Sequence, residues 1–152
     1  MVDPAGDTKR YADALVDGIE EALPRWVVRC VDRVYRAWAG PPSAELMGLA
    51  VEAGRRAAVD IVPRVRALLA ADIDEQWTTP LALVREGTTY AGTVLAGAGV
   101  PEVERDPMDE AMFPADVYGL TPGSFADIDP SLGDAGVAWG AAKAWTHRRR
   151  HG

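Results

Sequence analysis

The residues that perform much of enzyme chemistry are nearly missing from this sequence of 152 residues, which holds one cysteine, Cys30, and two histidines, His147 and His151. One cysteine cannot form an intrachain disulfide or supply a cysteine-based zinc site. Catalysis by Ser/His/Asp or Cys/His groups needs an imidazole beside the nucleophile, whereas both histidines flank a run of arginines. The scarcity of histidine also excludes a di-iron site of the ferritin type, which needs Glu-x-x-His pairs.

Long apolar runs are missing as well. No stretch approaches the roughly 20 apolar residues that span a bilayer, and the first residues lack the basic and apolar regions of a signal peptide. The glycine-rich runs at 97–99 and 133–136 match neither a dinucleotide-binding motif nor a P-loop. We therefore expect a cytoplasmic protein with no membrane segment and no cofactor.

Lysine is almost absent, because 14 of the 16 basic residues are arginine. The net charge of −7 is unevenly distributed: residues 1–70 are neutral, residues 71–146 carry −10, and residues 147–152 carry +3. An acidic body disfavours nucleic-acid binding, which needs a basic surface. The length fits one domain, with a frayed segment at 1–7 and a basic tail at 147–152.

Apolar residues in the first part of the chain recur with the period of an α-helix. They are Ala12, Val16, Ile19, Leu23, Val27, Cys30, Val34 and Trp38. The pattern predicts a helix from about Lys9, either kinked at Pro24 or divided there into two nearly collinear helices. It also places Trp26 and Trp38 in the core. The Ala-Gly-Pro-Pro segment at 39–42 ends the helix.

Further helices follow from the same kind of evidence. A second helix is capped by Ser43, contains Pro63 and forms an antiparallel hairpin with the first. A third runs from the Thr-Pro start at 78–80 to about Ala96. The proline-rich segment 101–130 is predicted to be a loop with helical turns near 107–112 and 124–127. A last helix begins at 131 or 134 and ends near 146, with Val137 and Trp139 as contacts.

These expectations define an all-α fold. It consists of a helical hairpin, a third helix and a C-terminal helix, with the acidic, loop-rich segment packed across the bundle. No segment of any length alternates between apolar and polar residues as a half-buried strand would.

Two groups of carboxylates are candidate ligands for a hard cation such as Mg²⁺ or Ca²⁺, which prefer oxygen. The first group is Asp72, Asp74 and Glu75, and the second is Asp127 and Asp129. An EF-hand loop is excluded, because its central glycine position would fall on Trp77. The structural alternative, which we favour, is that the acids belong to a solvated helix end and to turns.

Candidate partner-binding residues are Trp77, in a polar turn between helices, and four arginines at helical spacing, Arg25, Arg29, Arg33 and Arg36. The arginines could hold an anionic ligand or an acidic partner. We favour a structural alternative, in which they form ion pairs within the helix, as with Asp32, or with the acidic half of the same chain. Trp77 either packs under the loop-rich segment or anchors a partner.

Three segments of the chain carry a family resemblance. They are A-D-I-D-E-Q-W-T-T-P-L-A-L-V-R-E at 71–86, F-P-A-D-V-Y-G-L-T-P-G-S-F-A-D-I-D-P at 113–130 and W-G-A-A-K-A-W at 139–145. These segments resemble those of small helical proteins, without an assigned activity, from high-GC Gram-positive bacteria. The resemblance implies no activity, cofactor or partner.

Two functions of different classes follow. The leading hypothesis is a non-enzymatic protein that acts through protein–protein contact, as an adaptor, regulator or complex subunit, with a protein partner or a second copy of itself. The alternative is an enzyme, either one that acts on a small molecule or one dependent on a hard metal, that uses the carboxylates at 72–75 and 127–129. Nucleic-acid binding through the arginines is a third reading that the acidic body disfavours.

Overall fold

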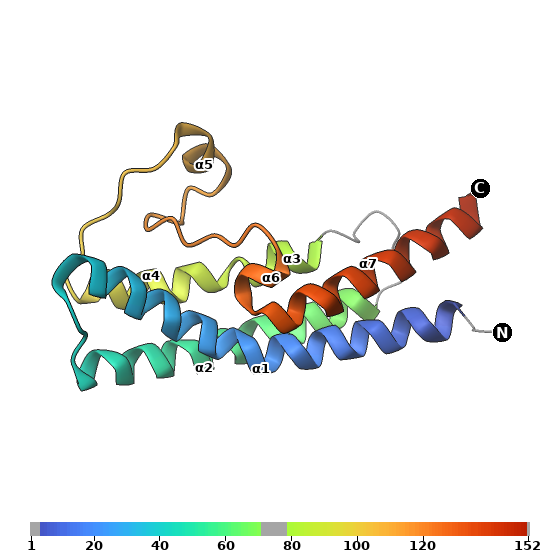
Figure 1. Cartoon of the computed structure of the whole chain (residues 1–152), viewed down its shortest axis with the longest axis horizontal. Coiled ribbons are helices and arrows are strands. Elements are labelled where there is room, and N and C mark those ends of the chain that lie inside the picture. The colour runs from blue at the N-terminus through green and yellow to red at the C-terminus, as the bar shows by residue number, and fades with distance from the viewer. Residues whose placement is uncertain (1–3, 71–78, 152) are drawn as a thin grey trace.

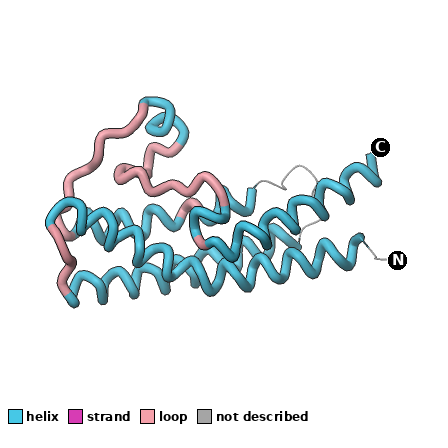
Figure 2. The backbone as a smooth tube through the Cα atoms, in the orientation of Figure 1, coloured by secondary structure: helices cyan, strands magenta, loops and turns pink. Residues whose placement is uncertain are grey.

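The computed structural model describes residues 4–70 and 79–151. Within these ranges it describes the side chains of residues 9–70 and 80–144. All regular structure in these ranges is α-helical, as the sequence predicted, and no strand occurs in them (Figure 2). The helices are α1 (Pro4–Ala39), α2 (Ala44–Ala70), α3 (Thr79–Val84), α4 (Gly87–Gly97), α5 (Pro107–Met112), α6 (Phe125–Ile128) and α7 (Pro130–His151). Within the same ranges, no helix combines the length and apolar content needed to cross a bilayer.

The predicted hairpin is formed by α1 and α2, which lie side by side (Figure 1). Each contains its proline within one continuous helix, Pro24 in α1 and Pro63 in α2, so α1 is not divided in two. Gly40 ends α1 with a positive φ of 89°, a conformation that residues with a Cβ rarely adopt. The Ser43 hydroxyl accepts a hydrogen bond from the Leu46 amide at 3.1 Å and caps α2.

The core is organised around α1, which packs against α2, α4 and α7. Its buried face contains the predicted stripe from Val16 through Leu23 and Trp26 to Cys30. The buried face of α2 adds Ala50, Ala57, Ile61 and Val65, and that of α4 adds Ala91 and Leu95. Because α1 contacts three other helices, its apolar positions form a wide stripe, while Glu20, Glu21 and Arg25 stay exposed on its outer side.

The predicted third helix is divided into two helices, α3 and α4, by a tighter backbone turn at residues 85–86. The amides of Glu86, Thr88 and Thr89 each bond to a carbonyl three residues earlier, at 3.0–3.1 Å, which is the spacing of a 3₁₀ turn. Gly87, directly after the break, lies against the first helix: a Cβ atom at this glycine would stand 2.9 Å from the Trp26 ring. This close approach fixes where the helix breaks.

The loop-rich segment contains the two predicted helical turns, now α5 and α6. Its second half packs onto the bundle, with Tyr118, Leu120 and Ile128 buried, whereas α5 has no buried residue and stands away from the other helices (Figure 1). Asp116 is a buried carboxylate that accepts hydrogen bonds from the amides of Leu120 and Thr121 at 2.9 and 2.5 Å and so holds this half of the loop together. Tyr118 is also buried, and its hydroxyl donates to the Val100 carbonyl at 2.8 Å. Two arginines bind loop carbonyls: Arg85 that of Pro122 at 3.0 Å, and Arg105 that of Phe113 at 2.8 Å.

The C-terminal helix is longer than predicted, since α7 begins at Pro130 and continues to His151. It packs along α1 in the opposite direction, so both ends of the chain lie at the same end of the molecule (Figure 1). Trp139 is buried, as predicted, but Val137 is 73% exposed and faces away from the bundle. The prediction for Val137 was wrong because one residue type cannot show which side of an alanine-rich helix packs.

Candidate functional site

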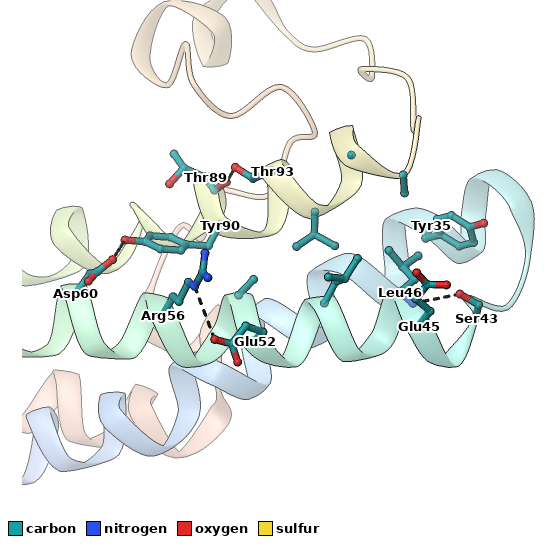
Figure 3. A pocket seen from close by; sticks show the side chains of 15 residues that line it. Tyr35, Ser43, Glu45, Leu46, Glu52, Arg56, Asp60, Thr89, Tyr90 and Thr93 are labelled. Carbon is teal, nitrogen blue, oxygen red and sulfur yellow. Dashed lines mark hydrogen bonds and ion pairs between the residues drawn. The ribbon is translucent and has the colours of Figure 1, made fainter.

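A groove of about 720 Å³ runs between α2 and α4 and is the candidate site (Figure 3). It extends from the start of α2, near Ser43 and Tyr35, to the contact between Asp60 and Tyr90. Its lining residues are Tyr35, Ser43, Glu45, Leu46, Leu49, Glu52, Ala53, Arg56, Asp60, Thr89, Tyr90, Thr93, Val94, Gly97 and Ala98.

One wall of the groove is a single face of α2. Leu46, Leu49, Ala53, Arg56 and Asp60 recur at steps of three or four residues, which places them on one side of a helix. Leu46 is buried at the base, whereas Leu49 is 55% exposed at the mouth. The face is apolar near the beginning of α2 and charged toward Asp60.

The opposite wall is α4, which contributes Thr89, Tyr90, Thr93 and Val94, together with Ala98 directly after the helix. The hydroxyl groups of both threonines are used within the helix: Thr89 donates to the Glu86 carbonyl at 2.7 Å and Thr93 to the Thr89 carbonyl at 2.8 Å. Because these donors are occupied, the methyl groups of the threonines and the side chains of Val94 and Ala98 give this wall an apolar character.

Tyr90 and Asp60 close one end of the groove. The Tyr90 hydroxyl donates to Oδ2 of Asp60 at 2.6 Å, which joins α4 to α2 (Figure 3). This bond, with partial burial and the nearby negative charge of Asp60, raises the pKa of Tyr90. One helical turn further along, Arg64 and Glu86 form an ion pair between the same two parts of the chain. These contacts hold the two walls together.

The other end of the groove is open and aromatic. Tyr35 lines it, and the ring of Trp38 meets that of Tyr35 edge-on, with 5.6 Å between centroids. Trp38 is 48% exposed, so its predicted place in the core was wrong. The helical stripe on α1 reaches Trp38 in correct register, but α1 ends at Ala39, beyond the part of the bundle that could cover it.

The charged side chains of the groove are mainly acidic. Glu45, Glu52 and Asp60 oppose one cation, Arg56, whose guanidinium group lies 3.7 Å from Glu52. Arg55, on the neighbouring face of α2, also approaches Glu52, at 3.5 Å. The lining therefore carries a net negative charge beside an apolar floor.

The predicted arginine face divides in the structure. Arg25 forms an ion pair with Asp129 at 3.3 Å, and Arg29 donates to the Ile128 carbonyl, so these two hold the junction of α6 and α7 against α1. Arg36 pairs with Asp32 at 3.0 Å, while Arg33 is exposed. The ion pairs of the structural alternative are therefore present for Arg25 and Arg36, whereas Arg29 bonds to a backbone carbonyl. A partner-binding role for the set stays a prediction.

The first acid cluster, Asp72, Asp74 and Glu75, lies outside the described residues, as does Trp77. The second belongs to a turn. Oδ2 of Asp127 accepts from the amides of Gly123 and Ser124 at 2.8 and 3.0 Å in a capping box.

Asp129 lies between α6 and α7, and each of its carboxylate oxygens has its own partner. Oδ1 accepts from the Ser131 amide at 3.0 Å and from its hydroxyl at 2.7 Å, while Oδ2 faces Arg25. The bonds to Ser131 and the charge of Arg25 lower the pKa of Asp129. Within residues 4–70 and 79–151, no group of three or more His, Cys, Asp or Glu side chains is arranged to hold a metal ion.

Sequence reasoning did not single out the groove. Tyr90 and Asp60 are 30 residues apart, and neither belongs to a local motif. The apolar residue Leu49 lies three positions after the buried Leu46 on α2, and this helical spacing did not reveal that Leu49 stays exposed. Sequence comparison adds nothing here: no family model, curated protein or solved structure matches the chain. The resemblance to helical proteins of Gram-positive bacteria stays a prediction.

Proposed function

We propose that this chain acts through protein–protein contact, as an adaptor, regulator or complex subunit, and that the groove between α2 and α4 is its contact surface. One observation carries the proposal: large apolar side chains stay exposed in the groove and beside its aromatic end. Leu49 is 55% exposed and Trp38 48% exposed, although both belong to otherwise well-packed helices.

Exposed apolar side chains that gather beside a groove and are rimmed by charge are typical of protein interaction sites. Tryptophan and tyrosine contribute more than most residues to binding energy, because they bury a large area and retain a polar group. Tyr35 and Tyr90 line the groove, and the Trp38 ring packs against that of Tyr35. The Tyr90–Asp60 bond and the Arg64–Glu86 pair keep the walls in place before a partner binds.

The alternative function, a small-molecule or hard-metal-dependent enzyme, uses the carboxylates at 72–75 and 127–129. Asp127 and Asp129 are engaged in the hydrogen bonds of a capping box and a turn, so no contact of the described residues favours it. The same proposal places the chain in the cytoplasm, where its one cysteine needs no disulfide partner. The acidic lining of the groove disfavours a nucleic acid as its occupant.

The experiment compares two charge-introducing substitutions of exposed apolar residues. Leu49→Glu lies in the groove, and Val137→Glu lies on the outer side of α7, where the side chain is 73% exposed. The tagged chain and both variants are incubated with a native bacterial lysate, and the bound proteins are measured by quantitative mass spectrometry. We expect a specific partner set for the original chain and for Val137→Glu, and its loss for Leu49→Glu.

Light scattering after size exclusion tests the self-association form of the proposal, since a dimer that Leu49→Glu dissociates would identify a second copy as the partner. Thermal unfolding of both variants establishes that they remain folded. A strictly monomeric chain whose bound proteins are identical for all three forms contradicts the proposal.

A further inference from the structure

We infer that the groove between α2 and α4 receives a cationic amphipathic helix of a partner protein. This inference rests on the proposed function and names the class of partner. Three features of the groove lead to it: its shape, its apolar floor and the sign of its charge.

The shape of the groove matches a helix. Its α2 wall extends from Ser43 to Asp60, which is about 25 Å at 1.5 Å per residue. Its two walls run in opposite directions, since Asp60 pairs with Tyr90, and Arg64, four residues later, pairs with Glu86, four residues before Tyr90. A long channel between two helices is the surface into which an amphipathic helix lays its apolar face.

The floor supplies apolar contacts at the spacing of such a helix. Leu46, Leu49 and Ala53 on α2 line the groove opposite Val94 on α4 and Ala98 at its end. A compact small molecule is a poorer fit, because small-molecule sites enclose most of the ligand surface, whereas the mouth of this groove leaves Leu49 more than half exposed. A helix that covers the full length would bury Leu49 together with the neighbouring aromatic end.

The charge of the groove selects the sign of the partner. Glu45, Glu52 and Asp60 are spread along its full length, and only Arg56 opposes them in the lining. Asp60 and Glu52 already have partners, namely Tyr90 and the arginines of α2. Glu45 stands exposed at the open end. Lysine or arginine residues beside the apolar stripe of the partner would complement these carboxylates, which favours encounter and orientation.

The test uses two synthetic peptides of about 18 residues, the length of a ~25 Å helix. Both carry leucine at positions i, i+3, i+7 and i+11. The flanking positions are lysine in one peptide and glutamate in the other. Binding to the full chain is measured by fluorescence anisotropy. We expect a Kd about tenfold lower for the lysine peptide at low salt, with a smaller difference at high salt because exposed charges are screened.

Substitutions then locate the binding. Glu45→Lys should weaken the lysine peptide and strengthen the glutamate peptide. Its matched control is Glu110→Lys, the same change of charge at an exposed first-turn position of α5, outside the groove. The control should leave both affinities unchanged. Leu49→Glu should weaken both peptides, because it places a charge on the apolar floor.

Each other result overturns the inference in a recognisable way. If the two peptides bind with equal affinity, charge does not select the partner. If Leu49→Glu leaves peptide binding unchanged, the groove is not the binding site. A dimer dissociated by Leu49→Glu shows a second copy as the occupant. An apolar dye that binds the groove when neither peptide does shows a small-molecule site. If the peptides fail while Leu49→Glu still abolishes capture of lysate proteins, the proposed function stands and only the class of partner is wrong.

Discussion

Gly54 lies directly against Pro24 where α2 meets α1: a Cβ atom at Gly54 would stand 2.6 Å from the Pro24 carbonyl oxygen and 3.0 Å from its Cα atom. Both of these neighbours are backbone atoms of a buried helix, and backbone cannot move aside as a flexible side chain can. Glycine at this position therefore sets how closely the two helices of the hairpin approach.

Gly54→Ala is expected to lower the free energy of unfolding by about 1–3 kcal/mol, because the added methyl group forces α1 and α2 apart. The measurement is the midpoint of urea unfolding followed by circular dichroism. Gly48→Ala is the matched control on the same helix, since nothing lies within 4 Å of its Cβ position. It should raise stability by about 0.5–1 kcal/mol through helix propensity alone. Equal effects of the two substitutions would show that the helices do not touch at Gly54.

Tyr90→Phe is expected to lower the free energy of unfolding by about 0.5–1 kcal/mol, because it removes the 2.6 Å bond to Asp60. The raised pKa of Tyr90 adds a dependence on pH. The folded state holds the phenolic proton more tightly than the unfolded state. The contribution is therefore complete below the ordinary tyrosine pKa of about 10 and is lost as pH rises through the higher pKa of the folded protein.

The measurement is the absorbance titration of tyrosinate at alkaline pH, in which the difference between the original chain and Tyr90→Phe isolates this one residue. Asp60→Asn should move the titration of Tyr90 toward lower pH, since the amide keeps an acceptor but has no charge. A Tyr90 titration that Asp60→Asn leaves unchanged would contradict the bond.

Asp129→Asn is expected to lower the free energy of unfolding at neutral pH. It should also make that free energy less dependent on pH in the acid range. The lowered pKa of Asp129 means that the folded state favours the carboxylate, through Ser131 first and Arg25 second. This contribution is present above the ordinary aspartate pKa of about 3.9 and is lost as pH falls below it. Urea midpoints between about pH 2 and pH 6 measure it. Ser131→Ala should produce part of the same change, whereas Asp134→Asn, on an exposed position of α7, should produce none.

The Cys30 thiol is expected to resist modification in the folded protein. It is 3% exposed, and burial raises its pKa to about 12 against the opposing effect of Arg33 and Arg29. At about pH 8, where an ordinary cysteine is partly ionised, almost none of this thiol is in the reactive thiolate form. A thiol reagent that absorbs on reaction should therefore modify Cys30 only as fast as the chain unfolds. A fast reaction in buffer, equal to that in urea, would place Cys30 at the surface.

The sequence contained enough to assign the helices, because the signals for a helix are local. Apolar positions at steps of three and four predicted α1 and α2, and the Gly-Pro-Pro turn at 40–42 predicted the hairpin between them. The turns at Pro107–Met112 and near Phe125–Ile128 followed from proline and capping residues within a few positions. The buried face of α1 from Val16 to Cys30 could also be predicted, because spacing along the chain determines which residues share one face of a helix.

Contacts between distant parts of the chain decided the rest. The third predicted helix is broken because Gly87 contacts Trp26. The sequence pattern of residues 79–96 cannot reveal that contact. Arg25 pairs with Glu21 on the same helix, a partner that helical spacing allows, and also with Asp129, 104 residues away, which no local pattern indicates. Trp38 is exposed because the bundle ends before it, even though its place on the stripe is that of a core residue.

The groove is formed wholly by contacts between distant parts of the chain. Sequence by itself determined that α2 has an apolar face and that the chain has an acidic half, because composition and period are properties of neighbouring residues. Only the tertiary structure decided that part of this face stays uncovered, since exposure depends on where α4 lies relative to α2. The bond between Tyr90 and Asp60 holds α4 at that position, and Leu49 remains open to a partner as a result.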